Sequence, residues 1–239
     1  NTGFYVRGGG PDQNLILLDG APVYNASHLF GFFSVFNADA LRSIELIKGG
    51  FPARFGGRLS SVIDIYVKEG NEKKFTGLAS VGFISSKLTV EGPLKADTAS
   101  FIISARRTYI DILTQPFIKA YSKGAYSFGY YFYDLNAKIN HKFSEKDRLY
   151  FSIYSGDDRF YLSANDKYTD NGIEYQSINK FNLGWGNITS SVRWNHILSN
   201  KLFANTSVTY SRFQFYTNIE TGTIRKLTSG SASQDLFNL

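Results

Sequence analysis

Alternation of apolar and polar residues is the dominant pattern of the chain from residue 71 onward. A period of two residues is typical of β-strands, because successive side chains point to opposite faces. The alternation is clearest over Asp134–Phe143, Arg148–Ser155, Thr189–Leu198 and Leu202–Tyr210. Weaker strand signals cover 75–83, 87–93 and 99–107. The pattern therefore predicts an antiparallel sheet of about seven to eight strands over 71–239.

Residues 1–70 follow a different pattern, with short apolar runs separated by Gly-rich turns. Leu15–Leu18 predicts a buried strand that ends at Asp19-Gly20, a dipeptide that favours tight turns. Asn37 is a good N-cap for a short helix. Two further strands are expected over 43–47 and 61–68. This segment is therefore expected to form a small α+β domain with boundaries 1–70.

The connections between the predicted strands differ in length in a regular way. Those at 94–98, 144–147 and 199–201 are short and polar, whereas those at 108–130, 160–179 and 217–232 are long. Short turns on one side and long loops on the other are typical of an outer-membrane β-barrel. The loop 108–130 is expected to be partly helical, because apolar residues recur in it at three- to four-residue spacing. These residues are Ile110, Leu113, Phe117 and Tyr121, with Pro116 limiting regularity.

The two faces of the predicted sheet can be assigned from the energetic cost of charge in lipid. A Lys or Arg on the lipid face at the bilayer midplane costs about 2–4 kcal/mol. Lys138 and Arg193 therefore mark the lumen face. The expected lumen residues are Asn136, Lys138, Tyr150, Ser152, Arg193 and Asn195, and the expected outward residues are Leu135, Ala137, Ile139, Leu149, Phe151, Ile153, Val192 and Trp194. Because an eight-stranded barrel is filled by its own side chains, the first domain either lies outside such a barrel or belongs inside a larger one.

Composition and motif spacing argue against several alternative functions. The chain has 239 residues and no Cys, which excludes disulfides and thiolate metal sites. The three histidines, His28, His141 and His196, share no metal-ligand spacing with carboxylates, and no catalytic Ser, His and Asp arrangement is apparent. Gly8–Gly10 lacks the Lys-Ser or Lys-Thr of a nucleotide loop, and a single Arg-Gly-Gly does not indicate nucleic-acid binding. We therefore expect no enzyme activity, no cofactor and no nucleic acid; the net charge of +6 is compatible with anionic lipid.

Three stretches of the first domain resemble the plug of TonB-dependent outer-membrane receptors, especially the Bacteroidota type. Tyr5–Gly9 resembles the arginine–glycine motif of that family, and Leu17–Val23 resembles its L-DG-P motif. Ile44–Gly50, with Arg54–Gly57 and Ile63–Ile65 behind it, resembles its I-E-x-x-[RK]-G…YGG…I-x-I signature. Phe55 and Lys48 stand where the family more often has Tyr and Arg. The resemblance covers the C-terminal part of a plug and about the first third of a barrel.

The resemblance implies a mainly β fold: a plug over 1–70 and, over 71–239, the first strands of a larger transmembrane barrel in the outer membrane of a Gram-negative bacterium. It implies an importer of a scarce small-molecule, glycan or peptide ligand, energised by TonB with the ExbB–ExbD motor. It further implies that Arg7 and Lys48 pair with carboxylates of the barrel wall, as a latch that holds the plug. The alternative is a non-transporting barrel that serves as an accessory subunit of an outer-membrane complex, with a surface lipoprotein partner.

Two aromatic regions are candidate ligand contacts. The first is a plug loop that by resemblance faces outward, with Tyr24, Asn25, His28 and Phe30 as its candidate residues. Its alternative interpretation is burial of Phe30 and its neighbours Phe32 and Phe33 against the wall. The second region contains Tyr126, Phe128, Tyr130 and Tyr131. It is interpreted either as a stacking surface for a ligand such as a sugar or, in preference, as an aromatic girdle at the membrane interface.

Overall fold

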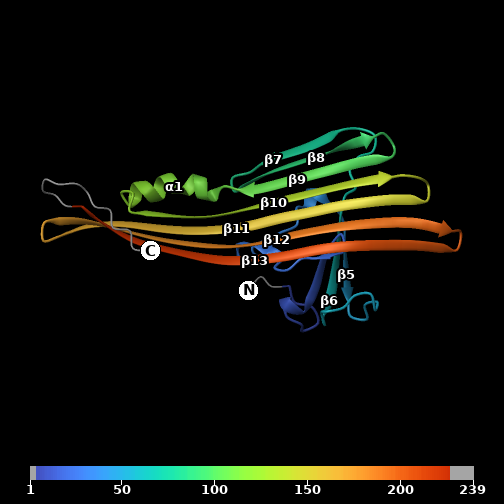
Figure 1. Ribbon diagram of the computed structural model, residues 1–239, viewed down its shortest axis with the longest axis horizontal. Helices are drawn as coiled ribbons and strands as arrows, with labels where there is room; N and C mark the ends of the chain where they lie inside the picture. Colours follow the sequence, from blue (N-terminus) through green and yellow to red (C-terminus); the bar gives the residue numbers. More distant parts are fainter. Residues whose placement is uncertain (1–3, 227–239) are drawn as a thin grey trace. The chain divides into compact units, whose positions relative to one another are not determined.

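The computed structural model describes residues 4–226, and two sheets dominate it (Figure 1). The smaller sheet, here the plug sheet, has the strand order β2-β1-β6-β5. The larger sheet, here the wall sheet, has seven strands in the order β13-β12-β11-β10-β9-β8-β7. The predicted fold class, mainly β with a small mixed domain before an antiparallel sheet, is confirmed.

The plug sheet is built around a parallel pair. Its strands are β1 (Asn14–Leu18), β2 (Ala21–Pro22), β5 (Leu41–Lys48) and β6 (Ser61–Val67). β1 runs parallel to β6, and β5 runs antiparallel to β6. A two-stranded sheet of β3 (Ser27–His28) and β4 (Phe33–Ser34) and three short 3-10 helices complete the region: η1 (Pro11–Gln13), η2 (Leu29–Gly31) and η3 (Ala38–Ala40). Asn37 caps η3, so the expected short helix is a single 3-10 turn.

The later strands of the wall sheet are longer than the earlier ones. Its strands are β7 (Thr76–Val81), β8 (Ser85–Lys95), β9 (Ala99–Thr108), β10 (Tyr126–Lys142), β11 (Asp147–Asp170), β12 (Ile173–Ser199) and β13 (Leu202–Lys226). The one α-helix of the described residues, α1 (Ile110–Tyr121), lies where apolar spacing predicted it and continues through Pro116. No helix among residues 4–226 is long and apolar enough to cross a membrane.

Two segments that were predicted to be long loops are instead occupied largely by strands, so these two predictions are wrong. The segment 160–179 consists of the ends of β11 and β12 around a tight turn at Asn171-Gly172, both with positive φ. The segment 217–232 continues β13 as far as Lys226, and the rest of it lies outside the described residues. A transmembrane strand needs only about 9–11 residues, whereas β11 has 24 and β12 has 27. Where both faces of a strand meet water, polar residues are tolerated on both, and the alternation that marks a strand is lost.

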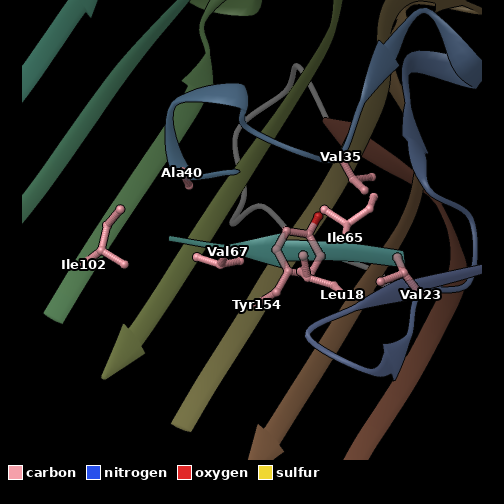
Figure 2. Close-up of a cluster of buried hydrophobic side chains, with 8 residues drawn as sticks. All are labelled: Leu18, Val23, Val35, Ala40, Ile65, Val67, Ile102 and Tyr154. Carbon is pink, nitrogen blue, oxygen red and sulfur yellow. The ribbon is translucent and has the colours of Figure 1, made fainter. Parts of the chain in front are cut away.

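The predicted alternation is confirmed over 134–140 of β10 and 150–154 of β11, whereas 202–210 of β13 has no buried face. Leu135, Ile139 and Phe151 are exposed, whereas Asn136, Lys138 and Ser152 are buried. The buried face of these strands meets residues of the plug, and the core cluster contains side chains from both (Figure 2). Its members are Leu18, Val23, Val35, Ala40, Ile65 and Val67 of the plug with Ile102 of β9 and Tyr154 of β11.

The chain contains two compact units. The first comprises 1–107, 132–157 and 186–214, so it includes the plug region together with one part of the wall sheet. The second comprises 108–131, 158–185 and 215–239, so among described residues it includes α1 and the remaining parts of β10–β13. The expected domain boundary at residue 70 stays a prediction, because these units follow proximity in space and not the order of the chain.

Candidate functional site: the contacts between plug and wall

Asp19 and Lys138 form a buried ion pair between the plug and the wall sheet. Lys138 Nζ donates to Asp19 Oδ1 at 2.7 Å and to the Val67 carbonyl at 2.9 Å. The side chains of Lys138 and Asp19 are 2% and 4% exposed, respectively. The turn after β1 fixes the carboxylate: Asp19 and Gly20 both have positive φ, and the Asp19 amide donates to the Ile65 carbonyl at 2.8 Å. Removing one partner of such a buried pair leaves an uncompensated charge and costs about 3–5 kcal/mol.

Asp134 of β10 is the centre of a second polar contact. Its Oδ1 lies 2.7 Å from His28 Nε2 and accepts from the Tyr154 hydroxyl at 2.9 Å. Its Oδ2 accepts from Arg106 Nε at 2.7 Å, and Arg106 Nη2 also donates to the Ser34 carbonyl at 2.7 Å. The His28 ring stacks on Phe132, with a centroid distance of 4.0 Å and an interplanar angle of 6°. The wall therefore holds the plug segment that contains β3 and β4 through charge, hydrogen bonds and stacking together.

Three further polar contacts add to these two centres. Asn37 Nδ2 donates to Ser104 Oγ at 2.7 Å, and both residues are buried. Lys87 Nζ lies 2.6 Å from Asp39 Oδ2. The Ser211 hydroxyl of β13 donates to the Pro22 carbonyl at 2.5 Å. The plug is therefore joined to β8, β9, β10 and β13 mainly by polar groups, with the apolar cluster of Figure 2 as the exception.

A polar cavity of about 360 Å³ lies beside the Asp19–Lys138 pair. Asp64 and Tyr66 of the plug and Arg193 of the wall line it. Burial raises the pKa of the Asp64 carboxyl, while the hydrogen bond from the Tyr66 hydroxyl at 2.7 Å opposes that rise. Burial and the same hydrogen bond raise the pKa of the Tyr66 phenol to about 12. Asp64 Oδ1 and Arg193 Nε have no hydrogen-bond partner among the described residues, so the cavity has polar groups that water can solvate.

The two predicted latch residues lie close to each other on the plug surface. Both side chains are exposed, and the Arg7 guanidinium lies directly over Gly49, the residue after Lys48. A Cβ at Gly49 would come within 2.7 Å of Arg7 Nη1, and Gly49 has a φ of +73°. Neither Arg7 nor Lys48 forms an ion pair with an acidic side chain within residues 4–226. Their role in a latch stays a prediction.

The candidate residues of the plug loop have different environments. Tyr24 and Asn25 are exposed and line a cavity of about 620 Å³ together with apolar residues such as Phe33 and Ile63. His28 is 1% exposed and contacts the wall, so the structure does not place it beside Tyr24 and Asn25 as an open ligand contact. The side chain of Phe30 lies outside the described part of the structure.

The four candidate aromatic residues of the second unit also lie in different environments. Tyr126 and Phe128 are each 48% exposed and share an apolar surface with α1. The Tyr130 hydroxyl donates to Asp158. Tyr131 lines a different, more polar cavity with Arg159 and Tyr216. No group of three or more metal-ligating side chains occurs among the residues that the structure describes.

Sequence reasoning missed the acidic residue of each buried contact, Asp19 and Asp134. In the sequence, Asp19 is recognisable only as a turn residue within the stretch that resembles the L-DG-P motif, and Asp134 only as one polar position of an alternating strand. A usable signal is nevertheless present: a lysine on the lumen face, such as Lys138, needs a counterion when a plug covers it. The partner could not be named, because 119 residues separate Asp19 from Lys138.

Comparison with known proteins supports the plug assignment. Residues 1–62 match the family model of the TonB-dependent receptor plug domain. Among curated proteins there is no match. This match covers most of the predicted plug, and the outer-membrane location expected from the resemblance agrees with it.

Similar solved structures include three receptors of Gram-negative bacteria. The siderophore receptor PirA of Acinetobacter baumannii has 16% identity and a TM-score of 0.45, over 85% of this chain and 41% of that one. The ferripyoverdine receptor of Pseudomonas aeruginosa has 12% identity and a TM-score of 0.45, over 98% and 40%. A mutant of the ferric enterobactin receptor PfeA of Pseudomonas aeruginosa has 14% identity and a TM-score of 0.37, over 90% and 49%. The chain thus spans less than half the length of these receptors.

Proposed function

We propose that this chain is part of a gated receptor that imports a ligand across the outer membrane with energy supplied through TonB and its ExbB–ExbD motor. The observation that carries the proposal is the polar character of the contact between plug and wall, above all the buried Asp19–Lys138 pair. A plug that closes a pore and yet moves must be held by contacts that water can replace.

The energetics of the contact fit this requirement. Removing one partner of a buried ion pair is costly, because the other charge stays buried and uncompensated. Separating the two charges into water costs less, because the hydration that each charge gains offsets much of the attraction that is lost. The cavity beside Asp19 holds polar groups that are ready for hydration, including Asp64 Oδ1 and Arg193 Nε. A force on the plug would therefore admit water along a path that is already polar.

Growth of the source bacterium tests the proposal even though the ligand is not identified. A deletion strain is compared with the strain carrying the full-length receptor on panels of iron sources, glycans and peptides. The proposal predicts a growth defect of the deletion strain on at least one limiting nutrient, and the same defect in a strain without TonB. A receptor gene that is dispensable on every nutrient, while its product purifies with a stable lipoprotein partner, would contradict import and favour the accessory role.

A further inference from the structure

Movement of the plug requires the buried Asp19–Lys138 pair to separate, and separation is costly while both charges are still buried. Each charge loses its counterion before enough water can reach it. A second cation in the same buried region would lower that cost, because the Asp19 carboxylate could exchange one positive partner for another. The wall sheet contains such a cation, Arg193 of β12, at the cavity beside the pair.

Arg193 and Lys138 lie beside the same tyrosine of the wall sheet. The Arg193 guanidinium carbon is 4.4 Å from the ring centroid of Tyr150, and Lys138 Nζ is 5.8 Å from that centroid. Tyr150 belongs to β11, the strand between β10 and β12. Cations within about 6 Å of a ring centroid are attracted by the negative face of the ring. Tyr150 therefore keeps the two positive groups close together although they repel each other.

Arg193 has no acidic partner in the resting structure. Among residues 4–226 it forms no ion pair with an Asp or Glu side chain, and its Nε is buried without a hydrogen-bond partner. Its guanidinium carbon is 5.9 Å from the ring centroid of Tyr66 in the plug. Lys138, by contrast, is already paired with Asp19. Arg193 is therefore a cation of the wall that faces the plug and binds no carboxylate at rest.

Asp19 has one carboxylate oxygen that is available for a second partner. Its Oδ1 accepts from Lys138 Nζ at 2.7 Å, whereas its Oδ2 is buried without a partner among the described residues. Asp19 and Arg193 line the same polar cavity of about 360 Å³. Liquid water occupies about 30 Å³ per molecule, so this cavity has room for several water molecules and for the movement of a side chain. The acceptor on Asp19 and the donor on Arg193 thus border one space that water can fill.

We propose that Arg193 is a positioning residue for gating, which receives the Asp19 carboxylate from Lys138 when the plug moves. The inference rests on the proposed function, because it concerns a plug that moves in order to open a pore. Exchange of one cation for another avoids a buried carboxylate without a counterion. A guanidinium can also bind a carboxylate through two parallel hydrogen bonds. Arg193 therefore stabilises the displaced plug and not the resting one.

The rate at which the full-length receptor opens tests this role. The purified receptor is inserted into a planar lipid bilayer, urea is added to loosen the plug, and the potassium chloride current is recorded over time. Arg193→Gln should slow the appearance of current by about tenfold, because the displaced plug loses its cation. Arg193→Lys should keep most of the wild-type rate. Arg212→Gln is the matched control and should not change the rate, since this exposed arginine donates to Gln214 of its own strand.

A second substitution identifies the group that Arg193 receives. In an Asp19→Asn receptor there is no carboxylate to transfer, so adding Arg193→Gln should cause no further slowing. If Arg193→Gln slows the Asp19→Asn receptor as strongly as it slows the wild type, Arg193 acts on another group, such as Asp64. That result would overturn the transfer from Lys138 to Arg193.

The direction of the change in rate separates this role from a purely structural one. If Arg193 only held the resting plug in place, through its contact with Tyr66, then Arg193→Gln should open faster than the wild type. Faster or unchanged opening would overturn the inference and leave the gated pore intact. A wild-type receptor that carries no current after its plug is loosened would overturn both the inference and the proposed function.

Discussion

Asp19 and Lys138 are joined by a hydrogen-bonded ion pair of 2.7 Å although 119 residues separate them in the chain. The pair connects a turn of the plug to the C-terminal part of β10, and both side chains are almost completely buried. Its polarity is the reverse of the predicted latch: the acid lies on the plug and the base on the wall. Lys87 with Asp39 repeats this polarity at a more exposed position.

Asp19→Ala in the full-length receptor should weaken plug docking by about 3–5 kcal/mol, because Lys138 would remain buried without its counterion. The measurement is the urea concentration at which a protease begins to cleave the plug. The surface pair Lys142–Glu145 provides the matched control, since Glu145 is 90% exposed. Glu145→Ala should change the docking free energy by no more than about 1 kcal/mol.

The double variant Asp19→Leu with Lys138→Met separates the loss of an ion pair from the loss of packing. Replacing both charges by apolar groups of similar volume is often neutral. We therefore expect the double variant to regain most of the docking stability that Asp19→Ala loses. A double variant as unstable as the sum of two single substitutions would show that the two charges do not act as a pair.

The stability of the plug should fall as pH rises from 10 to 12, and Tyr66 should be responsible for part of that fall. An unfolded Tyr ionises at the ordinary pKa of 10.0, whereas the folded Tyr66 keeps its proton up to a pKa of about 12. In that window the folded protein therefore holds one more proton than the unfolded protein, and raising the pH favours unfolding. Thermal unfolding of wild type and Tyr66→Phe should run parallel from pH 7 to 9 and diverge above 10, with the wild type falling more steeply. Identical slopes above pH 10 would contradict the assigned environment of Tyr66.

The pattern of apolar and polar residues was sufficient to predict an element and its buried face where one face of that element is apolar and the other polar. It predicted α1 from the spacing of Ile110, Leu113, Phe117 and Tyr121, and it predicted the buried face of β10 from Lys138. It failed over 160–179, because strands with water on both faces lose their alternation. It could not pair Asp19 with Lys138, because a contact between distant segments depends on how two sheets meet and leaves no local period in the sequence.

The latch hypothesis for Arg7 and Lys48 can be tested by leakage. Arg7→Ala with Lys48→Ala in the full-length receptor should increase entry of an antibiotic too large for ordinary porins, because two cations that hold the plug to the wall are removed. Arg58→Ala serves as a control for loss of a partly exposed plug cation, since the Arg58 guanidinium donates to the neighbouring Gly57 carbonyl. Unchanged leakage and unchanged transport in a folded double variant would show that neither residue acts as a latch.

The sidedness of the wall sheet predicts which turns reach the cell surface. The turn that contains Glu145 joins β10 to β11, and the turn at Asn171-Gly172 lies at the opposite end of β11. On intact cells, an impermeant maleimide should label Asp170→Cys and leave Glu145→Cys unlabelled until the outer membrane is broken. Labelling at position 145 and not at position 170 would reverse the orientation of the strands.

Import through a gated receptor requires the plug to move relative to the wall, and a reversible tether tests that movement most directly. Asn37→Cys with Ser104→Cys replaces a buried hydrogen bond between plug and wall by a disulfide. Asn14→Cys with Ser61→Cys replaces a buried hydrogen bond of the same kind within the plug sheet. In the full-length receptor, uptake of the nutrient identified by the growth screen is measured before and after reduction.

Gating by the plug predicts that the oxidised 37–104 tether abolishes uptake, that reduction restores it, and that the 14–61 tether leaves uptake unchanged. Full uptake through a receptor in which the 37–104 disulfide is complete would contradict gating by the plug.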